Sequence, residues 1–379
     1  MSAVLTQQDS PAVATSLRVR QVDPATAESE FVRRWRDLET RSIEGNAFRS
    51  PDLVIPALRL PVAGSEQPLA LTVQSDDGDL LALGIFEVCR GNRLLPMTHL
   101  RSWQSDFSLS DGLLVDRQHA EPALAALFQC VADHRDWNGI AFENRTADSP
   151  LSDTLHSAAV QTGATWHEDW QIERAVIPVD EIPDGDVFSM YSKSRRKSLK
   201  RNIRRLQSNG AVSYRLVCPE PGDHQAVDEF LRLEALGWKG DEGTALATDS
   251  EHEQFCRQLV DGFAANTRVV FGELCVDCRP IASTLNLLSG ETLFAMKIGW
   301  DPALAECSPG TLSELCLLQH CRQLTGVQRV DSCAKPGSYV DNIWPWRRTL
   351  TAGVFTTSMT STLAASALGR IKQLKRMLN

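Results

Sequence analysis

The densest group of chemically active side chains is a basic run, Lys193–Arg205, in which eight of thirteen residues are Lys or Arg. Apolar residues recur at helical spacing through this run: Leu199, Ile203 and Leu206. The pattern predicts a helix with one apolar stripe and a cationic remainder. Such a face suits the phosphates of CoA, of a nucleotide-linked sugar or of an aminoacyl-tRNA, or an anionic membrane surface. We predict that Arg195, Arg196 and Lys200 bind phosphate, and the alternative is a solvated surface helix.

Metal chemistry and nucleophilic triads find little support in the residue spacing. Cys275 and Cys278 form the only CxxC, and no second ligand pair at similar spacing accompanies them. They flank two residues between strand-like runs, which is typical of a turn, so we predict no metal site. No Ser/His/Asp or Cys/His spacing stands out among the eight histidines.

Length and composition bound the class of protein. A chain of 379 residues favours two domains, and shares of 42% hydrophobic and 23% charged residues indicate a folded, water-soluble protein. The formal net charge of −9 argues against nucleic acid as the main partner. No apolar run is long enough to span a membrane and the N-terminus lacks the layout of a signal peptide, so we expect a cytoplasmic location with reduced cysteines.

The elements that must position these residues follow one order twice. In the first half, periodicity predicts helices at Ala27–Thr40 and Ala120–Asp133, and strands at Leu69–Gln74, Leu80–Val88, Arg93–Leu100 and Gly139–Glu143. In the second half it predicts helices at Phe230–Leu236, Glu251–Ala265 and Thr311–Leu324, and strands at Val269–Val276, Ile281–Leu288, Thr292–Trp300 and Gln328–Ser332. The repeated order indicates a duplicated α/β unit, each copy a mixed, mostly antiparallel sheet flanked by helices.

Domain boundaries are predicted from composition. Residues 1–16 are small and polar and are expected to form a flexible leader; residues 17–180 form an N-terminal domain and residues 181–358 a C-terminal domain. The boundary lies in the proline- and acid-rich segment 176–186. Residues 359–379 are expected to form an amphipathic helix with Leu363, Ala367, Ile371, Leu374 and Leu378 on one side. Packing on the body or a partner contact is favoured for this helix over peripheral membrane binding, because a single short helix with four cations gives weak membrane affinity.

Several strings share order and residue types with one family. They are Ser192–Leu206, Leu233–Gly240, Gly243–Leu246, Lys297–Asp301, Ser308–Gly310 and Asp331–Ala334. The chain thereby resembles the GNAT-superfamily acyltransferases of the CelD/BcsL group, named after a cellulose-biosynthesis protein. The resemblance covers most of residues 186–356, and the first half only through Trp35, Leu38 and Asn46–Pro51. It implies two GNAT-like domains, as in the related Fem aminoacyl ligases, and acyl transfer from a thioester such as acetyl-CoA to an amine.

The resemblance also implies where the acyl donor binds. In GNAT folds the donor lies along a strand, and its pyrophosphate meets backbone amides at the start of the next helix, where the helix dipole favours an anion. The corresponding residues here are Lys297, Ser308, Gly310 and Thr311. The usual Arg/Gln-x-x-Gly-x-Gly/Ala phosphate loop is missing, and the alternative is a plain Ser cap with Pro in the first turn. Trp238 and Lys239, in the string Leu233–Gly240, are assigned to substrate or phosphate binding.

Acyl transfer to an amine also needs a base for the amine and an acid for the leaving thiolate. Asp331, Glu234 and Tyr339 are the candidates, with Tyr339 placed where GNAT enzymes often keep a leaving-group acid. Each has a structural alternative: Asp331 as a loop cap, Glu234 as a partner of Lys239, and Tyr339 as a packing residue. The resemblance thus implies an N-acyltransferase that uses acetyl-CoA or another acyl-CoA on a polar amine or sugar of cell-surface or exopolysaccharide synthesis. The alternatives are a Fem-like aminoacyl transferase using charged tRNA and a non-catalytic accessory protein of polysaccharide synthesis.

Overall fold

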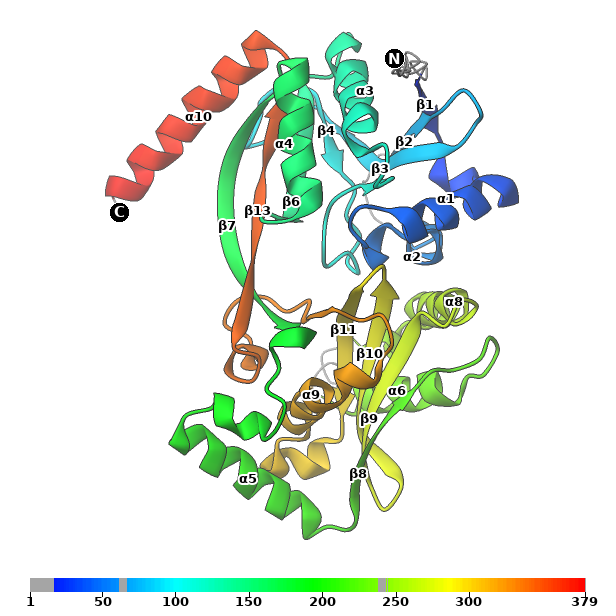
Figure 1. Ribbon diagram of the computed structural model, residues 1–379, viewed down its shortest axis with the longest axis vertical. Coiled ribbons are helices and arrows are strands. Elements are labelled where there is room, and N and C mark those ends of the chain that lie inside the picture. The colour runs from blue at the N-terminus through cyan, green and yellow to red at the C-terminus, as the bar shows by residue number, and fades with distance from the viewer. Residues whose placement is uncertain (1–16, 61–66, 238–242, 244, 379) are drawn as a thin grey trace, which may run out of the picture.

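The computed structural model describes residues 17–60, 67–237, 243 and 245–378. Within these residues the chain folds around one 13-stranded sheet flanked by helices (Figure 1). The strand pairs are antiparallel except for two parallel pairs, one in each half of the chain. The predicted class, a mixed α/β fold with a mostly antiparallel sheet, is confirmed.

The first half carries seven strands and four α-helices within its described residues. The strands are β1 (Arg18–Val22), β2 (Leu69–Gln74), β3 (Leu80–Cys89), β4 (His99–Ser102), β5 (Leu114–Val115), β6 (Gly139–Thr146) and β7 (Thr165–Pro178). The helices are α1 (Ser29–Arg41), α2 (Pro51–Ala57), α3 (Ala120–Asp133) and α4 (Pro150–Thr162). The expected strand at Arg93–Leu100 is wrong over most of its length, because Asn92 accepts hydrogen bonds from the amides of Leu94 and Leu95 and holds a turn there.

The second half follows the same plan. Its strands are β8 (Val212–Val217), β9 (Val269–Val276), β10 (Arg279–Ser289), β11 (Thr292–Trp300), β12 (Arg329–Asp331) and β13 (Trp346–Thr356). Its helices are α5 (Lys193–Gln207), α6 (Gln225–Leu236), α8 (Ser250–Ala264), α9 (Pro309–His320) and α10 (Met359–Leu378), with short 3-10 turns η5 (Leu246–Thr248), η6 (Pro302–Cys307) and η8 (Tyr339–Asn342). Asp277 and Cys278 form the two-residue turn between β9 and β10, both with positive φ, so the turn expected at the CxxC is confirmed.

The sheet order shows how the two halves are related. It runs β1-β2-β3-β4-β6-β13-β7-β12-β11-β10-β9-β8. From one end, β1 to β4 of the first half are followed by β6, which pairs parallel with β4, and then by β13, the last strand of the second half. From the other end, β8 to β11 of the second half are followed by β12, which pairs parallel with β11, and then by β7, the last strand of the first half. The duplication expected from element order is therefore present in the topology, and each half completes its sheet with the other half's final strand.

This exchange of strands corrects one sequence-based expectation. Two sheets that merely meet near residues 176–190 were expected, but β7 pairs with β12 through Val176–Pro178, so the sheet is continuous. β13 also pairs with β6 of the first half and with nearly the whole length of β7 (Figure 1). The proline-containing segment belongs to a strand because Pro178 lies at its end, where a missing amide donor is tolerated. The assignment of residues 17–180 and 181–358 to two domains stays a prediction.

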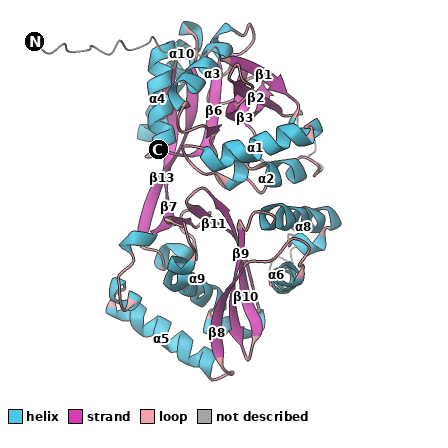
Figure 2. Ribbon diagram, turned by 45° about the vertical axis from the view of Figure 1, so that its right-hand side comes forward, coloured by secondary structure: helices cyan, strands magenta, loops and turns pink. Residues whose placement is uncertain are grey.

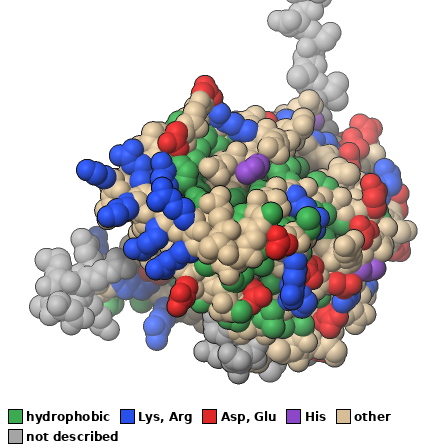
Figure 3. Space-filling view, turned by 90° about the horizontal axis from the view of Figure 1, so that it is seen from below, with side chains coloured by type: hydrophobic (Ala, Val, Ile, Leu, Met, Phe, Trp, Pro, Cys, Tyr) green, Lys and Arg blue, Asp and Glu red, His purple; other side chains and the backbone are tan. Residues whose placement is uncertain are grey.

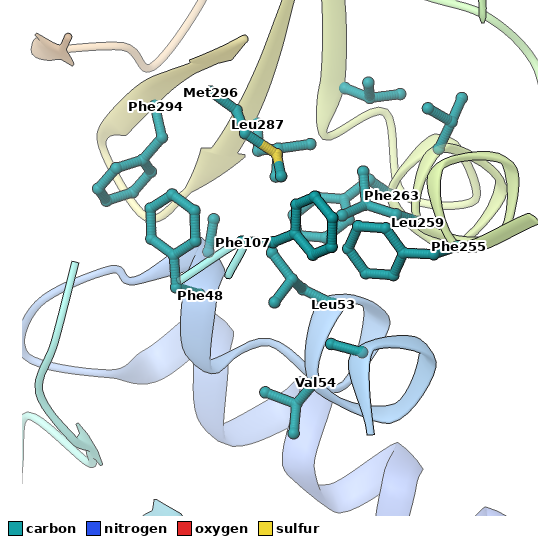
Figure 4. Close-up of a cluster of buried hydrophobic side chains, with 14 of the residues drawn as sticks. Phe48, Leu53, Val54, Phe107, Phe255, Leu259, Phe263, Leu287, Phe294 and Met296 are labelled. Atoms are coloured by element: carbon teal, nitrogen blue, oxygen red, sulfur yellow. The ribbon is translucent and has the colours of Figure 1, made fainter. Parts of the chain in front are cut away.

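A shared apolar core joins the halves. Phe48 of the first half packs edge-on against Phe294 of β11, and Phe107 stacks on Phe255 of α8 at 4.4 Å between ring centroids (Figure 4). Arg268 reinforces the contact, because its guanidinium pairs with Glu39 at 2.5 Å and with Asp52 at 2.6 Å. Burial of aromatic side chains from both halves in one cluster holds the second-half sheet in a fixed position against α1 and α2.

The second-half sheet is covered on both faces. α6 and α8 lie on the face toward the shared core, and α9 lies on the opposite face (Figure 2). Most residues of α9 are buried, including the polar Ser313 and Glu314, as expected of a helix between a sheet and further elements. α5 covers η6 and the start of α9.

Candidate functional site

The candidate donor site begins where β11 and β12 separate. The two parallel strands pair only over Thr292–Phe294 and Arg329–Asp331, and β11 then continues to Trp300. β11 also carries a bulge: Leu285 of β10 pairs with Lys297 and Asn286 pairs with Ala295, so Met296 is the extra residue. A bulge bends a strand and leaves backbone groups outside the ladder. The diverging strands and the bulge leave backbone groups of β11 outside the regular hydrogen-bond ladder.

The start of α9 has no side-chain cap. Ser308 adopts a left-handed conformation, with φ of 54°, and its side chain makes no capping hydrogen bond. Pro309 follows in the first turn. Uncapped amides at a helix start attract negative charge through their hydrogens and through the helix dipole. Gly310 has a packing role as well, because a Cβ there would lie 3.3 Å from the Trp300 indole.

The matching loop of the first half holds an acidic side chain. Asp116 lies just before α3 and accepts hydrogen bonds from the amides of Gln118 at 2.8 Å and His119 at 3.1 Å. Its other oxygen pairs with Arg41. The first turn of α3 lacks a side-chain cap, as the first turn of α9 does, so capping alone does not distinguish the two halves.

The tertiary structure brings the basic helix to the start of α9. Leu199 and Leu206 of α5 share a core cluster with Cys307 and Leu312, which lie on either side of the α9 start. The Arg205 guanidinium donates to the carbonyl oxygen of Glu306 at 3.3 Å. The apolar stripe predicted from sequence therefore docks α5 against η6 and α9, next to Ser308–Thr311.

The cations of α5 remain available to a ligand. In the part of the chain that the structure describes, none of its eight Lys and Arg side chains forms an ion pair with a carboxylate: Lys193, Arg195, Arg196, Lys197, Lys200, Arg201, Arg204 and Arg205. Lys200 lies over the Phe188 ring at 5.2 Å, and the Arg195 Nε is buried without a partner. Figure 3 shows Lys and Arg side chains gathered on the left of this lower face, where α5 lies. Eight cations without acidic partners produce a strongly positive surface beside the α9 start.

Lys297 and Glu234 are brought together, but on the face away from α9. The Lys297 ammonium donates to Glu234 Oε1 at 2.9 Å, and Glu234 Oε2 accepts from the Leu246 amide at 2.9 Å. Glu234 is buried on α6, which approaches β11 closely at Gly299. The neighbouring Ile298 side chain lies toward Gly310 on the other face, as strand alternation requires. Lys297 therefore does not adjoin Ser308–Thr311 through its side chain.

Asp331 lies in a buried ion-pair network. Its carboxylate contacts Arg348 of β13 at 3.2 Å and Arg174 of β7 at 3.5 Å, and accepts from the Cys333 amide at 2.8 Å. Arg348 also pairs with Glu44 of the first half at 3.0 Å. Burial lowers the pKa of Arg348, but the two carboxylates outweigh it and the net shift is upward. This arrangement ties the exchanged strands together at the point where β11 and β12 diverge.

Tyr339 contacts an acid that sequence reasoning missed. The phenol oxygen lies 3.3 Å from Glu314 Oε1, while the residue as a whole is 42% exposed. Glu314 lies one turn after Gly310 on α9 and is only 4% exposed, and its second oxygen has no partner. Burial raises the pKa of Glu314 to about 7, and burial together with Glu314 raises the pKa of Tyr339.

Glu314 can bind or release a proton near neutral pH. A carboxyl with a pKa of about 7 is half ionised under ordinary conditions, which suits an acid or base. Glu314 lies four residues after Gly310, a rise of about 6 Å along the helix, so the Glu314–Tyr339 pair lies close to the start of α9. The available signal was a single acid in a helix with no other acidic residue. Trp238 and Lys239, also predicted as binding residues, lie outside the described residues.

A separate polar cleft of about 850 Å³ lies between the halves at the other end of β11 and β12. Ser42, Glu44, Glu291 and Arg329 are among the residues that line it, and none of the site residues predicted from sequence does. Among the described residues, no group of three or more His, Cys, Asp or Glu side chains is placed to hold a metal ion. No described helix is long and apolar enough to cross a membrane.

Comparison with known proteins defines the class. Residues 193–339 match the family model described as an acetyltransferase (GNAT) domain, so the second half carries a GNAT acetyltransferase domain. The match ends before β13, the strand that pairs with the first half. No curated protein sequence gives a significant match.

Two solved structures share the fold across most of the chain. FemX superposes with a TM-score of 0.55 at 11% identity, covering 88% of this chain and 97% of FemX. The C-terminal DUF2156 domain of an Agrobacterium fabrum protein described as a lysylphosphatidylglycerol synthetase superposes with a TM-score of 0.53 at 14% identity, covering 90% of this chain and 95% of that domain. At these identities the likeness concerns the fold, and the similarity to Fem-like proteins expected from the sequence is confirmed at that level. The CelD/BcsL group stays a prediction.

Proposed function

We propose that this protein is an N-acyltransferase that moves an acyl group, acetyl in the simplest case, from CoA to an amine. The observation that carries the proposal is the position of α5 beside the uncapped start of α9. CoA bears a pyrophosphate and a further phosphate at its nucleotide end, and the two features offer helix amides and unpaired cations side by side. Arg195, Arg196 and Lys200 would hold the phosphates together with Ser308, Gly310 and Thr311.

Proton transfer is assigned to residues near the donor. Tyr339 would give its phenol proton to the leaving thiolate, and Glu314 in its protonated form would then reprotonate the phenolate, because the two share a hydrogen bond. Glu234 and Asp331 stay candidates for the base that accepts the amine proton. Both are already engaged, by Lys297 and by two arginines respectively, so either would have to exchange a partner before acting.

The acceptor is proposed from the resemblance to the CelD/BcsL group. It would be the amine of a polar metabolite or sugar used in cell-surface or exopolysaccharide synthesis, with the protein in the cytoplasm. A protein that binds CoA tightly yet transfers nothing to any amine would fit the accessory role instead.

Titration calorimetry with acetyl-CoA, CoA and dephospho-CoA tests the donor. Acetyl-CoA and CoA should bind, and dephospho-CoA should bind more weakly because it lacks one phosphate. The triple variant Arg195→Glu, Arg196→Glu and Lys200→Glu should lose about tenfold or more in affinity, since charge-assisted contacts become repulsive. The matched control reverses three exposed arginines of the first half with the same change in net charge: Arg59, Arg93 and Arg135. Equal affinity of both triple variants would refute the assignment.

Aminoacyl transfer from charged tRNA is the second candidate. The fold shared with FemX and the unpaired cations of α5 favour it, because a tRNA acceptor stem also carries phosphates. Transfer of radiolabel from acetyl-CoA to a glucosamine-bearing sugar nucleotide should be insensitive to ribonuclease. Transfer of a labelled amino acid from charged tRNA, abolished by ribonuclease, would replace the first proposal with the second. Radiolabel is preferred to a thiol reagent because all ten cysteines are free thiols.

A further inference from the structure

The C-terminal helix α10 turns its largest apolar side chains to solvent. Met359 is 82% exposed, Leu363 66% and Ile371 50%. They lie four and eight residues apart, which places them along one side of the helix with the exposed Ala367 between them. Scattered single apolar residues are common on surfaces, but a row of them along one helix marks an interaction surface.

The opposite side of α10 attaches it to the body. Ser361 and Ala365 are buried there, and Ala365 packs with Val354 of β13. Lys372 pairs with Asp169 of β7. The helix packs on the body as expected, but small residues make that contact and the large apolar residues of the stripe face outward. Leu374 and Leu378, of the same predicted stripe, have side chains outside the described part.

The charge of α10 differs from that of the rest of the chain. Residues 359–379 hold four basic residues and no acidic one, whereas the whole chain has a formal net charge of −9. Arg370 is exposed and lies between the outward apolar residues Leu363 and Ile371. The helix thus presents apolar side chains and the exposed Arg370 on its solvent side, whereas Lys372 is paired with Asp169.

We propose that α10 binds an anionic lipid surface, lying flat with Met359, Leu363 and Ile371 inserted below the headgroups. Amphipathic helices with basic residues around an apolar face bind membranes in this manner, because apolar burial adds to attraction by anionic headgroups. No described helix spans a bilayer, so α10 would lie on the surface. A second copy of the chain is a poorer occupant, because two such helices would bring like charges together.

Vesicle flotation with the full chain tests this proposal. The protein should float with vesicles of phosphatidylcholine and phosphatidylglycerol, bind weakly to phosphatidylcholine alone, and dissociate as salt is raised. The double variant Leu363→Ser and Ile371→Ser should bind about tenfold or more weakly, because two apolar side chains no longer enter the lipid. Val160→Ser on α4 is the matched control, since Val160 is 80% exposed elsewhere and its replacement should leave binding unchanged.

Arg370→Glu should weaken binding to the anionic vesicles only. All three replaced residues of α10 are exposed, so the melting temperatures should stay at the wild-type value. The proposal is overturned if the wild-type protein fails to float with anionic vesicles, or if the double variant floats as well as wild type. It is equally overturned if light scattering shows that the wild-type chain self-associates and that the double variant is monomeric.

Discussion

Glu314→Gln isolates the cost of burying one carboxylate beside the donor site. Glu314 has an ordinary pKa of 4.5 when unfolded and a pKa of about 7 in the folded protein. The folded state therefore holds this proton more tightly than the unfolded state. The resulting contribution to the free energy of unfolding is fully present below about pH 4.5 and is lost as pH rises through about 7. A difference of that size corresponds to about 3 kcal/mol in the free energy of unfolding. Gln cannot ionise, so the variant should escape this loss.

Urea unfolding at about pH 5 and about pH 8 measures the effect. The stability of Glu314→Gln relative to wild type should rise by roughly 2–3 kcal/mol between the two conditions, because only the wild type must ionise a buried acid at the higher pH. Gln keeps an oxygen acceptor for Tyr339, so that hydrogen bond is retained. The control is Glu306→Gln, at an exposed position of η6, where the relative stability should not change with pH. A relative stability of Glu314→Gln that does not change with pH would refute the reasoning.

Three further predictions concern the site. Asp331→Asn should lower the free energy of unfolding by about 3 kcal/mol, because two buried arginines lose a charged partner. Glu44→Gln should lower it less, since Arg348 keeps its contact with Asp331. An Asp331→Asn variant that is as stable as wild type but inactive would instead make Asp331 the base. Thr311→Asp should weaken acetyl-CoA binding about tenfold while leaving the melting temperature unchanged or higher, because a carboxylate in the first turn favours the helix but repels phosphate. Titration calorimetry measures the acetyl-CoA affinity of this variant against that of the uncharged control Thr311→Val. Tyr339→Phe should lower kcat roughly a hundredfold with little change in KM, and an unchanged kcat would exclude it as the acid.

Local sequence determined most elements of this protein. The runs Leu69–Gln74, Val269–Val276 and Thr292–Trp300 were predicted with the bounds that β2, β9 and β11 have, because alternating or continuous apolar residues between clear turns specify strands. The basic run was predicted as the helix α5 for a similar reason, since its apolar residues follow the helical period. The resemblance to GNAT acyltransferases could also be recognised from sequence, because several short strings occur in the order typical of that family.

The long strands that join the halves could not be predicted locally. β7 is rich in charged and aromatic residues and is half-exposed over most of its length, so it lacks the apolar pattern of a buried strand. It becomes a strand because β13, distant in sequence, supplies its hydrogen-bond partners. Pairing of this kind depends on contacts between residues about 180 positions apart, which no local window contains.

The roles of the charged site residues were likewise decided by tertiary structure. The strings that carry the family resemblance identified Asp331 and Glu234 as candidate acids, but only the fold pairs them with Arg348 and Lys297. Glu314 was overlooked because its significance lies in burial, which raises its pKa by removing water from around the carboxylate. Sequence specifies which charges are present, whereas the free energy of each charge depends on the partners and the solvent that the folded chain places around it.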